Sequence, residues 1–192
     1  MDQSVRGAAF LEDFPYLRRK KGNAGLESLE NAIVDLGGSM RLGDVKDMAW
    51  YPVSERVIFL KALKKAFGWT DANVFDMGKS APRVPSTMKF FLKYIVSPHM
   101  AFKSSADYWS HYFSFGTFVP VEYTEDGSKN AGRLVMEIRD FDVDPIMCVQ
   151  LSGYFLGVGV MTKMVDPTIR ETKCVHHGGP HHEFLMEWKI KA

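Results

Sequence analysis

The spacing of apolar residues changes near residue 105, and this change constrains the fold more than any other feature of the sequence. Before it, apolar side chains recur at three- and four-residue steps, as in GLESLENAIVDLG (25–37) and SERVIFLKALKKAFGW (54–69). That spacing is typical of amphipathic helices. A third helix is expected from about Ser86 to Val96, between Pro85 and Pro98.

The second half contains short runs rich in Phe, Val and Tyr. YFSFGTFVPVEY (112–123) and GRLVMEIRDF (132–141) flank a turn-forming linker, which predicts an antiparallel hairpin. PTIRETKCV (167–175) and EFLMEWKI (183–190) predict two more strands.

A long buried helix is expected between these hairpins, over 145 to 161. Asp144 can cap it, and Pro145 suits its first turn. Gly153 and Gly157 share one face, which suggests close approach of another backbone or a ligand, or simply tight packing.

The order of elements predicts an α+β fold, with a helical N-terminal half packed on an antiparallel sheet. We expect one ligand-binding domain, 1–192. Its helical lobe covers about 1–105, and the sheet, long helix and metal lobe cover about 106–192.

Charge and composition exclude several classes of protein. The formal net charge is +1, which provides no general attraction to nucleic acid or to a membrane surface. No stretch approaches the ~20 apolar residues of a membrane span, and the N-terminus does not resemble a signal peptide. A cytoplasmic chain is expected, in which two cysteines are thiols or ligands rather than a disulfide.

Potential metal ligands are concentrated near the C-terminus. The segment ETKCVHHGGPHHEF (171–184) contains four of the six histidines and one of the two cysteines. Two explanations remain open: the segment binds a metal ion, or the histidines belong to a polar loop and the cysteines are buried as small apolar residues.

The C-terminal half resembles the four-vinyl-reductase domain, also called the hydrocarbon-binding domain, of phenol- and xylene-responsive regulators. Gly153-Tyr154, Glu171, Cys174, Gly178 and His182 match its motif, and the match covers roughly residues 108 to 190. The resemblance implies a wider fold that haem-based nitric-oxide sensors and vesicle-tethering subunits share.

The resemblance also implies a structural zinc site. Its ligands would be Cys148, Glu171, Cys174 and His182, at spacings of 23, 3 and 8 residues. His182 stands where the family has a cysteine, and zinc accepts both. His176, His177 or His181 could replace His182 as the ligand. Because residues 171 and 174 lie on opposite faces of a regular strand, a bulge or turn must bring them together.

A pocket for an apolar or aromatic ligand is the second implication of the resemblance. In the family, a His and a Trp bind the ligand hydroxyl. The candidates in this sequence are Trp109 and His111, with His99 a weaker one. Other candidate lining residues are the aromatic side chains Phe113, Phe118 and Tyr154.

The main hypothesis is a sensor protein that binds a small apolar or aromatic molecule, without catalysis. Its partners would be a second copy in a homodimer and a downstream signalling protein. Two alternatives remain: a tetrapyrrole-handling enzyme related to vinyl reductases, and a haem-based gas sensor with His99 or His111 on the iron. Haem is not expected, because the Tyr-x-Ser-x-Arg motif of haem sensors is not found.

Overall fold

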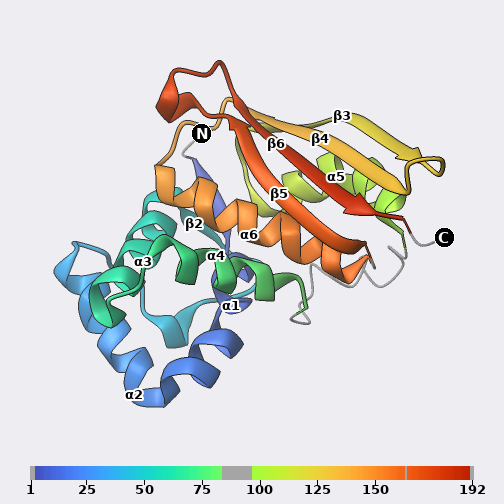
Figure 1. Ribbon diagram of the computed structural model, residues 1–192. Coiled ribbons are helices and arrows are strands. Elements are labelled where there is room, and N and C mark those ends of the chain that lie inside the picture. Colours follow the sequence, from blue (N-terminus) through green and yellow to red (C-terminus); the bar gives the residue numbers. More distant parts are fainter. Residues whose placement is uncertain (1–2, 84–96, 163, 191–192) are drawn as a thin grey trace.

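A computed structural model describes residues 3–83, 97–162 and 164–190. The predicted α+β fold is confirmed, because helices dominate the first half and antiparallel strands the second (Figure 1). The N-terminal lobe contains, in order, β1 (Ser4–Arg6), α1 (Ala8–Leu11), α2 (Phe14–Asp35), η1 (Leu42–Asp44), β2 (Trp50–Pro52), α3 (Val53–Phe67), α4 (Asp71–Ser80) and η2 (Ala81–Arg83).

The C-terminal lobe is built on a four-stranded antiparallel sheet of order β3-β4-β6-β5. Its elements are α5 (Pro98–Tyr112), β3 (Thr117–Asp126), β4 (Ala131–Arg139), α6 (Pro145–Met161), β5 (Val165–Lys173), η4 (Val175–His177) and β6 (His182–Lys189). Both predicted hairpins are therefore present, and α6 has the predicted bounds.

Helix α6 lies between the two lobes. In Figure 1 it runs beneath the sheet, with the N-terminal helices on its other side. Ten of its seventeen residues are buried. A helix buried on most sides explains why its sequence is almost uniformly apolar instead of amphipathic.

Three glycines bring α4 and α6 into backbone contact. A Cβ atom added at Gly153 would lie 2.1 Å from the carbonyl oxygen of Phe75. The corresponding distances are 2.4 Å from Gly157 to Lys79 and 2.3 Å from Gly78 to Gln150. Of the explanations that the sequence left open for Gly153 and Gly157, close approach of another backbone is therefore the one observed.

One face of the sheet forms the core of the C-terminal lobe. Alternate residues of β4 and β6 point to this face and are paired in register, as in Leu134 with Met186 and Met136 with Phe184. All four are buried. The alternation predicted for the last strand therefore positions an apolar face toward α5 and α6.

Helices α4 and α5 are absent from the sequence-based prediction. We expected a helix to end before Pro98, whereas Pro98 starts one: Ser97 caps α5, its hydroxyl accepting a hydrogen bond from the amide of Met100 at 3.3 Å. Proline at the first helical position needs no hydrogen-bond partner for its nitrogen. The helix predicted from about Ser86 to Val96 lies outside the described residues.

No helix among the described residues is both long enough and apolar enough to cross a membrane.

The start of α6 depends on Asp144. Its Oδ1 accepts a hydrogen bond from the amide of Ile146 at 3.0 Å, and its Oδ2 pairs with Lys61 of α3 at 2.6 Å. We expect Asp144→Ala to lower the free energy of unfolding by about 1–2 kcal/mol through loss of the cap. Urea unfolding measures this, and Asp144→Asn is the control because it keeps a capping oxygen. Equal losses in both variants would show that the cap contributes little.

Candidate ligand cavity and metal centre

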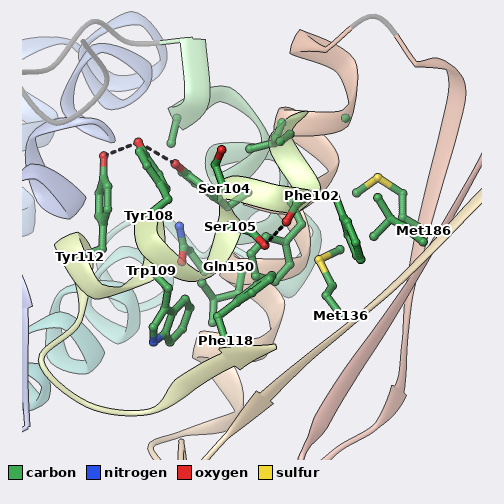
Figure 2. Close-up of a pocket in the computed structure, with 18 of the residues that line it drawn as sticks. Phe102, Ser104, Ser105, Tyr108, Trp109, Tyr112, Phe118, Met136, Gln150 and Met186 are labelled. Atoms are coloured by element: carbon green, nitrogen blue, oxygen red, sulfur yellow. Dashed lines mark hydrogen bonds between the residues drawn. The ribbon is translucent and has the colours of Figure 1, made fainter. Parts of the chain in front are cut away.

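A cavity of about 120 Å³ lies between α5, α6 and the inner face of the sheet. Figure 2 shows its walls, with Phe118 and Met136 from the first hairpin facing Phe102 and Trp109 of α5. Most of the lining is apolar. A cavity of roughly 150 Å³ lined by apolar side chains can hold a benzene molecule, so this one suits a small ring.

Polar groups gather at one end of the cavity in a chain of hydroxyls. Tyr154 donates to Tyr108 at 3.5 Å, Tyr108 donates to Tyr112 at 3.1 Å, and Tyr112 donates to the buried carboxylate of Glu12. The dashed lines in Figure 2 follow the chain from Tyr112 through Tyr108. Burial raises the pKa of Tyr108 and of Tyr154, so these phenols stay protonated.

A buried ion pair lies behind this polar end. Arg56 Nη1 is 2.7 Å from Asp13 Oδ2, and both side chains are almost fully buried. The guanidinium lies over the rings of Phe10 and Phe59, at 5.2 Å from each centroid. Because Arg56 lines the cavity, its charge is part of the site and not only of the helical core.

Four of the six predicted ligand contacts line the cavity: Trp109, Phe113, Phe118 and Tyr154. His99 and His111 are exposed and lie outside the described lining, so the structure does not bring either side chain to the cavity. The Trp109 ring packs in the core, and its Nε1–H donates to the carbonyl of Phe115 at 3.2 Å. Trp109 therefore contributes its ring to the lining, while its N–H is already bonded within the protein.

Sequence reasoning missed several polar residues of the cavity, among them Glu12, Tyr108, Tyr112 and Gln150. Each is isolated in the sequence, and α5 had not been predicted. Within a predicted α5, the four-residue spacing of Tyr108 and Tyr112 would have placed both hydroxyls on one face. For Glu12 the sequence offers no comparable signal.

The four predicted metal ligands meet in one cluster. The ligand atoms of Cys148, Glu171, Cys174 and His182 all lie within 4.8 Å of one another. His182 Nδ1 is 2.8 Å from Glu171 Oε1 and 3.5 Å from Cys148 Sγ. The cluster joins α6 to the second hairpin, because Cys148 belongs to the helix and the other three to the hairpin.

An irregularity in β5 allows this meeting. The register of β5 on β6 shifts between Glu171 and Lys173, and the strand ends there. Cys174 is the N-cap of the short helix η4, and its carbonyl oxygen accepts a hydrogen bond from the amide of Gly179 at 2.8 Å. Gly178 has a φ of 82°, which favours glycine. The required departure from a regular strand is thus a bulge followed by a glycine turn.

The imidazole of His182 is oriented by the backbone. Its Nε2 is 2.8 Å from the carbonyl oxygen of Phe141, and a carbonyl can only accept, so Nε2 carries a hydrogen. Nδ1 is therefore the nitrogen that faces Glu171 and Cys148. A backbone partner on the far nitrogen is the usual arrangement for a metal-bound histidine.

Without a bound cation, the thiols and the imidazole of the cluster favour their protonated forms. Burial and the nearby Glu171 raise the pKa of both Cys148 and Cys174. Burial alone would lower the pKa of His182, but the hydrogen bonds to Glu171 and to the Phe141 carbonyl, together with the negative charges of Glu171 and Asp142, raise that pKa overall. A metal ion would replace these protons, because it stabilises thiolates and neutral imidazole.

The remaining histidines of the segment have other surroundings. His177 is exposed. His176 Nδ1 lies 3.6 Å from Asp142, and His181 Nε2 lies 3.3 Å from Glu137. Of the four histidines, His182 is the one whose ring nitrogen lies in the Cys148 cluster.

No protein-family model matches the chain, and no curated protein sequence matches it. Solved structures that match include H-NOX proteins. One from S. oneidensis in the Fe(II) ligation state has a TM-score of 0.71 at 11% identity, over 98% of both chains. One from K. algicida has a TM-score of 0.61 at 16% identity, over 97% of both chains. An oxygen-binding H-NOX domain related to soluble guanylate cyclases has a TM-score of 0.61 at 10% identity, over 98% of this chain and 96% of the other.

These comparisons establish the fold, which is that of H-NOX proteins. The implied likeness to haem-based sensors is thereby confirmed at the level of fold, while membership of the hydrocarbon-binding family stays a prediction. The cofactor prediction, zinc with no haem, is wrong on this comparison. The matching proteins include ones described by their haem distortion and haem redox potential, so the fold points to haem.

The cavity lining determines which side chains of this chain could bind the iron of a haem. Axial ligands of haem iron come from His, Cys, Met or Tyr side chains. Among the lining residues that the structure describes there is no His or Cys, and the candidates are tyrosines and methionines. Tyr108 and Tyr154 are protonated phenols, so iron would have to displace a proton to bind either oxygen.

Proposed function

We propose that this chain is a sensor domain whose ligand occupies the cavity between α5, α6 and the sheet. One observation carries the proposal: an apolar cavity with a polar end, in a fold shared with H-NOX proteins, among them one in an Fe(II) ligation state and one described as oxygen-binding. A ligand there would contact α6, which packs directly on α4 of the other lobe. Its binding could therefore change how the two lobes pack, which is what a partner would detect.

Haem is the ligand that the fold favours. When bound, it would supply an iron centre that takes up a small gas molecule. Tyr108 or Tyr154 would hold the iron, and the apolar walls would hold the ring. A haem is several times larger than the cavity, so α5 or α6 would have to move away from the sheet.

A small aromatic or apolar molecule is the second candidate, and the cavity itself favours it. The volume of about 120 Å³ fits a single ring without movement of any element. Aromatic side chains such as Phe118 and Phe155 can pack on such a ring edge to face.

Absorbance titration with hemin separates the two candidates. If haem is the ligand, a sharpened Soret band saturates at one equivalent, and Tyr108→Phe or Tyr154→Phe shifts that band. If a small ring is the ligand, hemin gives no saturable band, while calorimetry with benzene or toluene gives one site. Val158→Phe, which fills the cavity, should abolish either signal. Binding that persists in this variant would rule out the cavity.

We also propose that Cys148, Glu171, Cys174 and His182 bind one divalent transition-metal ion. Two soft sulfur ligands with imidazole and a carboxylate suit a four-coordinate ion with no open position. The role would be structural, since the ion would tie α6 to the second hairpin. Dimerisation and a downstream signalling protein stay predictions.

The proposed metal site predicts that the stability of the fold depends on pH in opposite directions in metal-loaded and in metal-free protein. In metal-free protein the folded pKa of His182 is raised, so its ion pair with Glu171 stabilises the fold below pH 6.5, and this contribution is lost as pH rises through the folded pKa. In loaded protein, acid protonates the ligands and releases the ion, so stability rises with pH. Thermal melts from pH 5 to 8.5, with and without chelator, measure both slopes. Parallel slopes would contradict the metal site.

A further inference from the structure

The side-chain amide of Gln150 is buried against the cavity and has no partner among the described residues. Gln150 belongs to α6, lines the cavity and is 5% exposed. No described residue forms a hydrogen bond with its side chain, whereas the N–H of Trp109 and the hydroxyl of Ser105 donate to backbone carbonyls. Figure 2 shows Gln150 among the other lining side chains. A buried amide normally finds a hydrogen-bond partner, so this one points to a polar group on the ligand.

The backbone that carries Gln150 is held in place by α4. A Cβ atom added at Gly78 would lie 2.3 Å from the carbonyl oxygen of Gln150, so the two helices are in direct contact at this point. They touch again at Gly153, one turn further along α6. Because the start of the side chain is fixed, the amide loses less freedom when a ligand binds to it.

The amide of a glutamine offers two kinds of hydrogen-bonding group side by side. Its Nε2 donates two hydrogens and its Oε1 accepts, and both belong to one planar group. A ligand satisfies donor and acceptor together when it carries an acceptor and a donor on neighbouring atoms that point to the same side. A lactam, which is a cyclic amide, has this arrangement, because a small ring holds its C=O and its N–H on the same side.

Other polar groups leave part of the Gln150 amide unpaired. A ketone can only accept, so Oε1 would stay without a donor. An ionised carboxylate also only accepts, an apolar cavity disfavours its charge, and the cationic lining residue Arg56 already pairs with Asp13 at 2.7 Å. A single hydroxyl oxygen cannot meet both atoms of the amide in good geometry. Each polar atom left unpaired in a buried site weakens binding.

We propose that Gln150 selects a small lactam. The lactam C=O would accept a hydrogen bond from Gln150 Nε2 and its N–H would donate to Gln150 Oε1, while apolar walls such as Phe118 and Phe155 hold the rest of the ring. This inference rests on the proposed function in its small-ring form. It adds an amide to that ring and makes Gln150 the residue that determines specificity.

δ-Valerolactam and cyclohexanone test the inference, because these two six-membered rings differ only in that the N–H of the lactam replaces a CH₂ group. Calorimetry on the intact chain should give a dissociation constant about tenfold lower for the lactam, as one added buried hydrogen bond would produce. In Gln150→Met, which keeps the length of the side chain but loses the amide, the order should reverse, because the lactam N–H is then buried without a partner.

Two further variants complete the experiment. Gln150→Asn, whose shorter side chain withdraws the amide from the ligand, should also lose the lactam preference, and it replaces Gln150→Met if that variant does not fold. His111→Gln is the control: His111 is exposed and lies outside the described lining, so both dissociation constants should stay unchanged.

The outcomes separate this inference from the function beneath it. Equal or tighter binding of cyclohexanone to the unmodified protein overturns the lactam and leaves the cavity as a ligand site. Tighter binding of cyclohexanol than of the lactam also overturns it, because one hydroxyl would then satisfy Gln150. If neither the lactam, cyclohexanone, cyclohexanol nor toluene binds, the small-ring form of the proposed function fails as well. A lactam preference that survives in both Gln150→Met and Gln150→Asn overturns the role of this residue.

Discussion

Cys174→Ser is expected to remove the bound metal ion and to lower the melting temperature by roughly 10 °C. The four ligands join α6 to a hairpin more than twenty residues away in sequence, so the ion closes a long loop. Losing such an ion costs several kcal/mol, and each kcal/mol shifts the melting temperature of a chain this size by about 2–4 °C. Elemental analysis and thermal melting of reduced protein measure the two effects.

The matched control is His177→Ala. His177 is in the same segment but is exposed and outside the cluster, so both the metal content and the melt should stay unchanged. Cobalt(II) provides a spectroscopic check, because thiolate-to-cobalt absorption requires Cys148 or Cys174 as ligands. Unmodified protein that contains no metal, melts identically with a chelator and shows no such absorption would contradict the site.

Gly153→Ala is expected to lower the free energy of unfolding by about 3 kcal/mol. Alanine favours helices over glycine, but its Cβ would lie 2.1 Å from the carbonyl oxygen of Phe75. Because that neighbour is backbone, α4 and α6 must separate, and overpacking of this kind costs about 1–3 kcal/mol or more. Urea unfolding measures the loss.

Gly127→Ala is the control for this variant. Gly127 lies in the turn between β3 and β4, and an added Cβ there meets nothing within 4 Å. Its stability should stay within about 0.5 kcal/mol of the unmodified protein. A Gly153→Ala protein as stable as this control would show that the contact between α4 and α6 can relax, and that the lobes are not held rigidly at α6.

The elements that the sequence predicted well are those with local signals. Asp144 and Pro145 mark the start of α6, and alternation marks the last strand, so both were predicted with nearly the observed bounds. The sequence does not predict helix α5 because the proline at its start is equally compatible with the end of a preceding helix. Capping by Ser97 was the signal that could have corrected this.

The two candidate sites differ in how many of their residues can be predicted from the sequence. Metal ligands must be Cys, His or carboxylate, and the resemblance to the hydrocarbon-binding domain implied which four residues of this chain would serve. The cavity has no such restriction, because aromatic side chains fill cores as often as they line pockets. Its polar end joins Glu12 of the N-terminal lobe to Tyr112 of α5, a contact that only the tertiary structure creates.

Native mass spectrometry tests most directly whether this chain is a sensor domain with its ligand in the cavity. The protein would be measured as purified, and again after incubation with hemin or with toluene, beside the Val158→Phe variant. The account predicts a mass increase of one haem or one small molecule per chain in the unmodified protein and none in the variant. The same increase in both proteins, or no increase in either, would contradict it.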